Sequence, residues 1–125
     1  MQHTITWFEI PAVDFDRAVT FYSTILDVEI NKSAFQGDPH GFLPAEPGVV
    51  SGAVVLRDDL KPASTGTIIY FNVAERMAAT LERVERAGGK VLVPETAIDP
   101  QGSFAFILDS EGNRIGLHSP PVQEP

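Results

Sequence analysis

The same order of structural elements runs twice along this chain of 125 residues. Each half starts with a strand rich in β-branched and aromatic residues, continues with an amphipathic helix and ends with three short apolar segments. Three pairs of apolar residues recur 60 positions apart: Val13 and Val73, Ala18 and Ala78, and Phe21 and Leu81. One βαβββ unit covers only one face of its sheet with a helix, so two units are expected to close their free faces around a shared cavity. An ordinary α+β domain whose helices match by chance is the alternative.

Capping, turn and periodicity signals place the elements. In the first half we predict a strand at residues 3–10, a helix at 15–26 after the N-cap Asp14, and strands at 28–34, 41–44 and 50–56. In the second half we predict a strand at 67–73, a helix at 75–87 with Ala78, Leu81 and Val84 on its inner face, and strands at 90–93, 103–108 and 114–118. The chain is therefore predicted to be one α+β domain spanning residues 1–125, with modules at 3–57 and 67–119, a polar linker at 58–66 and a tail at 120–125.

The last two strands are expected to form a β-hairpin. Between them, Gly112 can adopt a positive φ, and Asp109 and Asn113 can hydrogen-bond their own backbone. Because side chains alternate across a strand, Arg114, Gly116 and His118 share one face of the final strand. The opposite face is apolar.

Composition excludes several classes of protein. Lys and Arg number 9 against 17 Asp and Glu, and the net charge of −8 disfavours nucleic acid and anionic membranes as partners. No apolar run approaches the roughly 20 residues of a spanning helix, and no export signal opens the chain. The absence of cysteine excludes disulfides and thiolate sites, so a cytoplasmic domain is expected.

Several segments, in order, resemble the vicinal-oxygen-chelate superfamily, which includes glyoxalase I, bleomycin-resistance proteins and extradiol dioxygenases. These segments are Trp-Phe-Glu-Ile-Pro-Ala-Val-Asp at 7–14, Arg17-Ala18, Phe21-Tyr22, Ala-Gly-Gly-Lys-Val at 87–91 and Phe-Ile-Leu-Asp-Ser-Glu-Gly-Asn-Arg-Ile-Gly-Leu at 106–117. The resemblance implies two βαβββ modules that form a U-shaped, partly closed sheet around a cavity, with the helices outside, usually in a homodimer.

The resemblance also implies where a metal would bind. Enzymes of the superfamily usually hold a divalent metal with four His, Glu or Gln side chains from the first and last strands of each module. The matching positions are Trp7, Val55 or Leu56, Ile68 and Gly116. A divalent ion needs about three converging oxygen or nitrogen donors, and these residues offer none. We therefore expect no metal cofactor, unless a divalent metal is held by displaced ligands.

Strand periodicity predicts which side chains face the cavity. If the ligand face carries Trp7, it also carries Glu9, and the same parity adds Tyr70, Asn72, Arg114 and His118. These six residues form the predicted ligand-binding set, an apolar wall with a few directional polar groups. The alternatives are structural: the aromatic residues can fill core volume, and Arg114 can be a solvated surface charge. His3 and His40 are expected at the surface.

Glu9 needs a partner because a carboxylate between Phe8 and Ile10 is costly to bury alone. His118 or Arg114 are the candidates, although water would also serve. A Glu9–His118 couple could transfer protons, and these two residues are the predicted catalytic pair.

Three functions compete. The favoured one is a metal-free protein that binds a small aromatic or planar molecule. The second is a lyase, isomerase or dioxygenase that uses either a metal on displaced ligands or Glu9 and His118. The third is a module that only dimerises or binds a protein partner.

Overall fold

The computed structural model describes residues 3–121, which fold as two βαβββ modules. The first module contains β1 (Trp7–Pro11), α1 (Phe15–Leu26), β2 (Asn31–Phe35), β3 (Asp38–Phe42) and β4 (Ser51–Val55). The second contains β5 (Tyr70–Asn72), α2 (Met77–Arg86), β6 (Lys90–Ala97), β7 (Ser103–Leu108) and β8 (Arg114–Ser119). The predicted tail lies partly outside the described residues.

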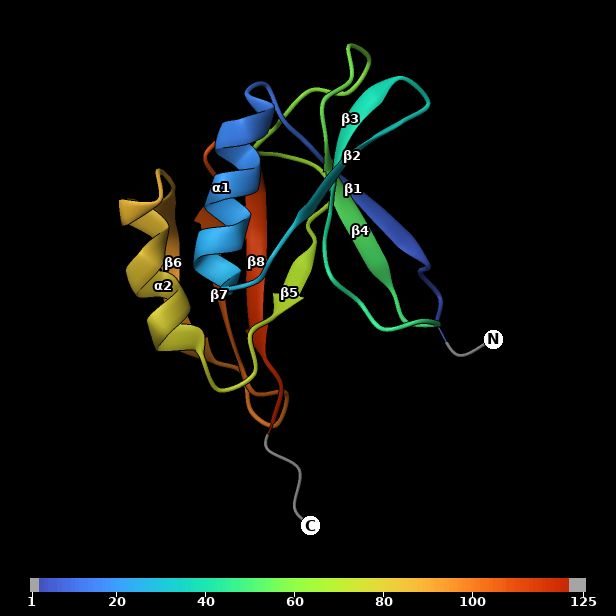
Figure 1. Cartoon of the computed structure of the whole chain (residues 1–125). Helices are drawn as coiled ribbons and strands as arrows, with labels where there is room; N and C mark the ends of the chain where they lie inside the picture. The colour runs from blue at the N-terminus through green and yellow to red at the C-terminus, as the bar shows by residue number, and fades with distance from the viewer. Residues whose placement is uncertain (1–2, 122–125) are drawn as a thin grey trace.

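Each module forms its own four-stranded sheet, and the two sheets have the same topology. The strand orders are β1-β4-β3-β2 and β5-β8-β7-β6, and in each sheet the first strand runs parallel to the last. The sheets are not closed into a barrel, and α1 and α2 lie next to each other on one side of the molecule (Figure 1). The predicted tandem α+β fold is confirmed.

The residue match behind the predicted repeat is wrong by one position. The buried residues of α2, Met77, Thr80 and Val84, follow Ala18, Phe21 and Ile25 of α1 by 59 positions. Ala78, predicted on the inner face, is exposed, and so is Val13, whereas its supposed equivalent Val73 is 1% exposed. The repeat therefore lies in the topology, and the offset of 60 came from chance similarities among apolar residues.

Strand β3 starts earlier than predicted because its turn was misplaced. Gln36 and Gly37 have φ values of 55° and 83°, and positive φ at both central residues is typical of a type I′ hairpin turn. Phe35 consequently pairs with Asp38, and residues 38–40, predicted as a loop, belong to the strand. His40 is thereby drawn into the first sheet.

One hydrophobic core joins the two modules. Ile10, Phe21 and Tyr22 pack in the same cluster as Val73, Ile107 and other residues of the second module. Phe71 of β5 makes an edge-to-face contact with Phe8 of β1, with ring centroids 5.7 Å apart. The modules are therefore fixed relative to each other by apolar burial.

The β7–β8 turn adds a polar link between the modules. Asp109 accepts hydrogen bonds from the amides of Glu111 and Asn113, both at 2.9 Å, as the sequence predicted for this turn. The Asp109 carboxylate also accepts from the Tyr22 hydroxyl at 2.6 Å, and Asn113 Nδ2 donates to the Pro11 carbonyl at 2.8 Å. The hairpin turn thus holds the first module's helix and strand.

Glu111 extends this link to the start of α1. Its carboxylate accepts from the amides of Val13 and Asp14 at 2.8 and 2.7 Å and from Arg17 Nε at 2.8 Å. Burial alone would raise the pKa of Glu111, but the hydrogen bonds from Arg17, the Asp14 amide, Ser110 and the Val13 amide outweigh it and lower this pKa to about 2.

Candidate functional site

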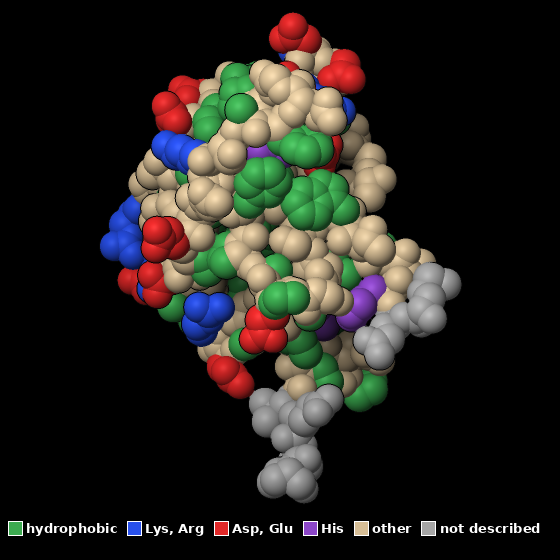
Figure 2. Space-filling view, turned by 45° about the vertical axis from the view of Figure 1, so that its right-hand side comes forward, with side chains coloured by type: hydrophobic (Ala, Val, Ile, Leu, Met, Phe, Trp, Pro, Cys, Tyr) green, Lys and Arg blue, Asp and Glu red, His purple; other side chains and the backbone are tan. Residues whose placement is uncertain are grey.

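A cavity of about 880 Å³ lies between β1 of the first module and the linker, β5 and β8 of the second. Four residues of the predicted set line it, namely Trp7, Glu9, Tyr70 and Arg114. Trp7 and Tyr70 are 43% and 51% exposed, so their rings are accessible to a ligand and are not packed inside the hydrophobic core. The volume lies within the range of roughly 300–1,000 Å³ that is typical of small-molecule sites. Figure 2 shows hydrophobic side chains reaching the surface when the side of the molecule that carries the first sheet is turned forward.

A smaller hollow of about 520 Å³ adjoins this cavity at Tyr70, which lines both. His118, Phe104 and Phe106 complete most of its wall. The rings of Phe104 and Phe106 have centroids 5.1 Å apart, and those of Tyr70 and Phe106 are 5.8 Å apart. His118 Nε2 lies 2.8 Å from the carbonyl oxygen of Gln101. The two hollows thus share an aromatic boundary.

The partners of Glu9 differ from those predicted. Arg57 Nη1 donates to Glu9 Oε1 at 3.1 Å, and Trp7 Nε1 donates to Glu9 Oε2 at 3.3 Å. His40 Nε2 lies 4.0 Å from Glu9 Oε2. Pairing with His118 or Arg114 was therefore the wrong expectation. Sequence reasoning missed Arg57 because it follows β4 in a polar connector.

His40 is buried, with 3% exposure, and the prediction that it lies at the surface is wrong. Its ring stacks on Phe42, with centroids 5.4 Å apart, and meets the edge of Phe35 at 5.5 Å. Nδ1 lies 3.0 Å from the carbonyl oxygen of Asp38, which can only accept, so Nδ1 carries the proton. His40 therefore lies near Glu9 at a distance too long for a hydrogen bond, and it is not among the residues that line the cavity.

The predicted catalytic pair is not in direct contact. Glu9 lines the larger cavity and is held by Trp7 and Arg57, whereas His118 lines the adjoining hollow. A catalytic role for the pair remains a prediction that requires a substrate to span both hollows.

Asn72 and Arg114 have contrasting surroundings. Asn72 is exposed, and its side-chain oxygen accepts from the Ala74 amide at 2.9 Å, which supports the positive φ of 49° at Ala74. Arg114 is half-buried, with its guanidinium carbon 4.9 Å from the centroid of Phe106. Asn72 thus has a local structural task, while Arg114 lies against an aromatic wall.

The positions that the resemblance assigns to metal ligands do not fit a metal ion. A Cβ at Gly116 would lie 2.3 Å from Cδ2 of Tyr70, so the tyrosine ring covers the place where a ligating side chain would begin. Within residues 3–121, no three His, Cys, Asp or Glu side chains come together as a metal site would require. The side chains of Trp7, Val55, Leu56 and Ile68 supply no suitable donor.

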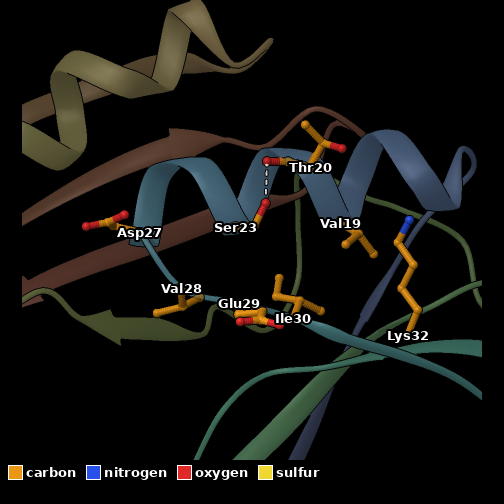
Figure 3. A pocket seen from close by; sticks show the side chains of 8 residues that line it. All are labelled: Val19, Thr20, Ser23, Asp27, Val28, Glu29, Ile30 and Lys32. Atoms are coloured by element: carbon orange, nitrogen blue, oxygen red, sulfur yellow. Dashed lines mark hydrogen bonds between the residues drawn. The ribbon is translucent and has the colours of Figure 1, made fainter.

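A second groove lies between α1 and the start of β2, and it has a different character (Figure 3). Its wall comes from the first module alone and contains no aromatic residue. Ser23 Oγ donates to the Thr20 carbonyl at 3.1 Å, and Lys32 pairs with Asp16 at 3.1 Å. Because these polar groups serve local contacts, the inter-module cavity is the stronger candidate site.

No helix within the described part of the chain is long and apolar enough to cross a membrane.

Comparison with known proteins gives the family. The model of the Glyoxalase/Bleomycin resistance protein/Dioxygenase superfamily matches residues 4–117. A glyoxylase-like domain-containing protein of Didymella fabae is 33% identical over 127 residues, which cover 94% of each chain.

Solved structures agree in fold. A glyoxalase-related enzyme from Fulvimarina pelagi has a TM-score of 0.73 at 17% identity, covering 98% of this chain and 91% of that one. The fosfomycin resistance protein FosX from Listeria monocytogenes has a TM-score of 0.69 at 16% identity, covering 100% and 97%. The chain therefore belongs to the Glyoxalase/Bleomycin resistance protein/Dioxygenase superfamily, also called the vicinal-oxygen-chelate superfamily.

Proposed function

We propose that this chain is a metal-independent member of the superfamily that binds a small aromatic or planar molecule in the inter-module cavity. Trp7 and Tyr70 supply the faces against which a flat ligand stacks, and Glu9 and Arg114 supply polar contacts that orient it. No bond in the ligand need be broken for this function.

The observation that carries the proposal is the position of the Tyr70 ring. It lies over Gly116, a position at which enzymes of the superfamily usually place a metal ligand, and it is also a wall of the cavity. An aromatic surface thus occupies the place of a chelating side chain. Such a surface supports binding by stacking rather than by coordination.

We also propose that the protein is a homodimer. Within residues 3–121, six large hydrophobic side chains are at least 43% exposed, and three of them, Ile5, Trp7 and Tyr70, line the cavity. A second copy seated near the cavity mouth would cover part of this apolar surface. The cytoplasmic location stays a prediction from composition.

Trp7 makes the binding proposal directly testable, because it is the chain's single tryptophan and lies in the cavity wall. A panel of non-fluorescent aromatic compounds should change its emission and raise the melting temperature of the protein. Trp7→Ala should lower the affinity for the compounds that bind. Phe35→Ala should not lower this affinity, because it removes an exposed ring outside the cavity lining. If no aromatic compound shifts either signal, or if Trp7→Ala leaves every affinity unchanged, the proposed site is wrong.

A further inference from the structure

We propose that the ligand of the inter-module cavity carries a carboxylate and that Arg114 binds it. This inference rests on the proposed function and narrows it from a small aromatic molecule to an aromatic acid. It starts from the contrast between Arg114 and the other cations near the two modules' junction.

Arg114 has no acidic partner among the described residues. Arg17 pairs with Glu111 at 2.8 Å, and Arg57 pairs with both Glu9 and Asp59 at 3.1 and 3.0 Å. No hydrogen bond or ion pair within residues 3–121 engages the side chain of Arg114. In a chain with 17 acidic residues against 9 basic ones, an arginine left unpaired in a cavity is available to an anion from outside.

The guanidinium of Arg114 is also held in place. The guanidinium carbon lies 4.9 Å from the centroid of the Phe106 ring. The backbone of Arg114 is also fixed, because its amide donates to the Ala63 carbonyl at 3.3 Å. Its Nε is enclosed and has no acceptor in the described part of the chain. A ligand cannot reach this enclosed atom, so an incoming acceptor would bind the terminal Nη atoms, which have no acidic partner among the described residues. A planar carboxylate matches the fork of a guanidinium better than a single-atom acceptor does.

The charges of the cavity wall favour an anion at the end of the cavity that Arg114 lines. Glu9 is the carboxylate of the wall, and its charge is already opposed by Arg57. Lys61 also lines the cavity and adds a second positive charge. The ligand that fits this wall has a flat apolar body against Trp7 and Tyr70 and an acid group directed to Arg114.

Matched acid and amide pairs test the inference with the whole protein. Phenylacetate and phenylacetamide, and 4-hydroxybenzoate and 4-hydroxybenzamide, differ in charge at one group and have nearly the same shape. We expect calorimetric titration to show tighter binding of the acid in each pair. Arg114→Gln should lower the affinity for the acid by about 10- to 100-fold and leave the affinity for the amide nearly unchanged. Arg86→Gln, which removes the same charge from an exposed position on α2, should preserve the preference for the acid.

The outcomes separate this inference from the proposed function. Equal binding of acid and amide, or an acid preference that survives Arg114→Gln, overturns the carboxylate inference while aromatic binding stands. If none of the four compounds binds and none changes the Trp7 emission, both the carboxylate inference and the proposed aromatic binding are overturned. Arg114→Lys is the control for misfolding. It keeps the positive charge but lacks the planar guanidinium, so it should restore part of the affinity for the acid.

Discussion

Glu111 shows how a single side chain can carry a large share of the link between the modules. Its carboxylate binds two backbone amides and Arg17, and its side chain is fully buried. Because its pKa is lowered to about 2 from 4.5, the stabilisation is complete above the unfolded value and is lost as the pH falls from 4.5 towards 2.

Glu111→Gln should therefore lower the free energy of unfolding at pH 7 by about 1–3 kcal/mol. The deficit should shrink as the pH falls below 4.5, because the carboxyl group of the unfolded wild-type chain then takes up a proton that the folded chain, with its pKa of about 2, does not yet bind. Urea unfolding at pH 7, 5 and 3 measures this, with Glu82→Gln as a control at an exposed position on α2. A deficit that is constant with pH would contradict the charge-based account.

Gly116 gives a second prediction at the scale of one residue. Gly116→Ala places a Cβ 2.3 Å from the Tyr70 ring, so the ring must rotate away at a cost of about 1–3 kcal/mol. In a Tyr70→Ala background, the same substitution should cost little. The double-mutant cycle from chemical unfolding measures the coupling between the two positions. A coupling near zero would show that the ring does not need the space above Gly116.

At the scale of elements, Tyr22 connects α1 to the β7–β8 turn. The phenol is fully buried, and burial, followed by the neighbouring Asp109 carboxylate, raises its pKa well above 10, so it remains a hydrogen-bond donor. Tyr22→Phe should destabilise the protein by about 1–3 kcal/mol, because the Asp109 carboxylate loses a donor while buried. Tyr70→Phe, whose ring is 51% exposed, should change the unfolding free energy by less than about 0.5 kcal/mol. Similar losses for both variants would argue against the link.

Local signals predicted the elements well where the chain follows common capping and pairing rules. The helix Phe15–Leu26 has the predicted ends because Asp14 accepts from the Arg17 amide and Asp27 takes a left-handed conformation with φ 54°. The β7 bounds are also as predicted. Strand β3 was misplaced because Gln36 adopts a positive φ that its side chain does not signal. Strand β6, predicted at residues 90–93, runs on to Ala97 through two irregularities in its pairing with β7.

Part of the cavity lining could be predicted from the sequence, but the pairs within it could not. Alternation along β1 and β8 grouped Trp7, Glu9 and Arg114, which line the cavity, although Phe8 and Ile115 of the opposite parity line it as well. The partners of Glu9 could not be predicted, because Arg57 lies in a connector and His40 in a strand whose register depends on a distant turn. Contacts between strands depend on packing, which periodicity within one strand does not contain.

At the scale of the whole molecule, the exposed apolar residues near the cavity predict self-association. Analytical ultracentrifugation should give about twice the 13.6 kDa mass of one chain. A mass of one chain at every concentration used for binding would contradict the proposed homodimer. It would not contradict the proposed binding of a ligand in the cavity.

The account depends above all on a cavity that binds aromatic molecules without a metal. The most direct measurement is the affinity of one aromatic ligand, followed by Trp7 emission, on protein of known metal content before and after treatment with a chelator. We predict substoichiometric metal and the same affinity in both samples, because the wall offers rings instead of chelating side chains. Binding that disappears with the chelator and returns with one equivalent of zinc, manganese, iron or nickel would contradict the account.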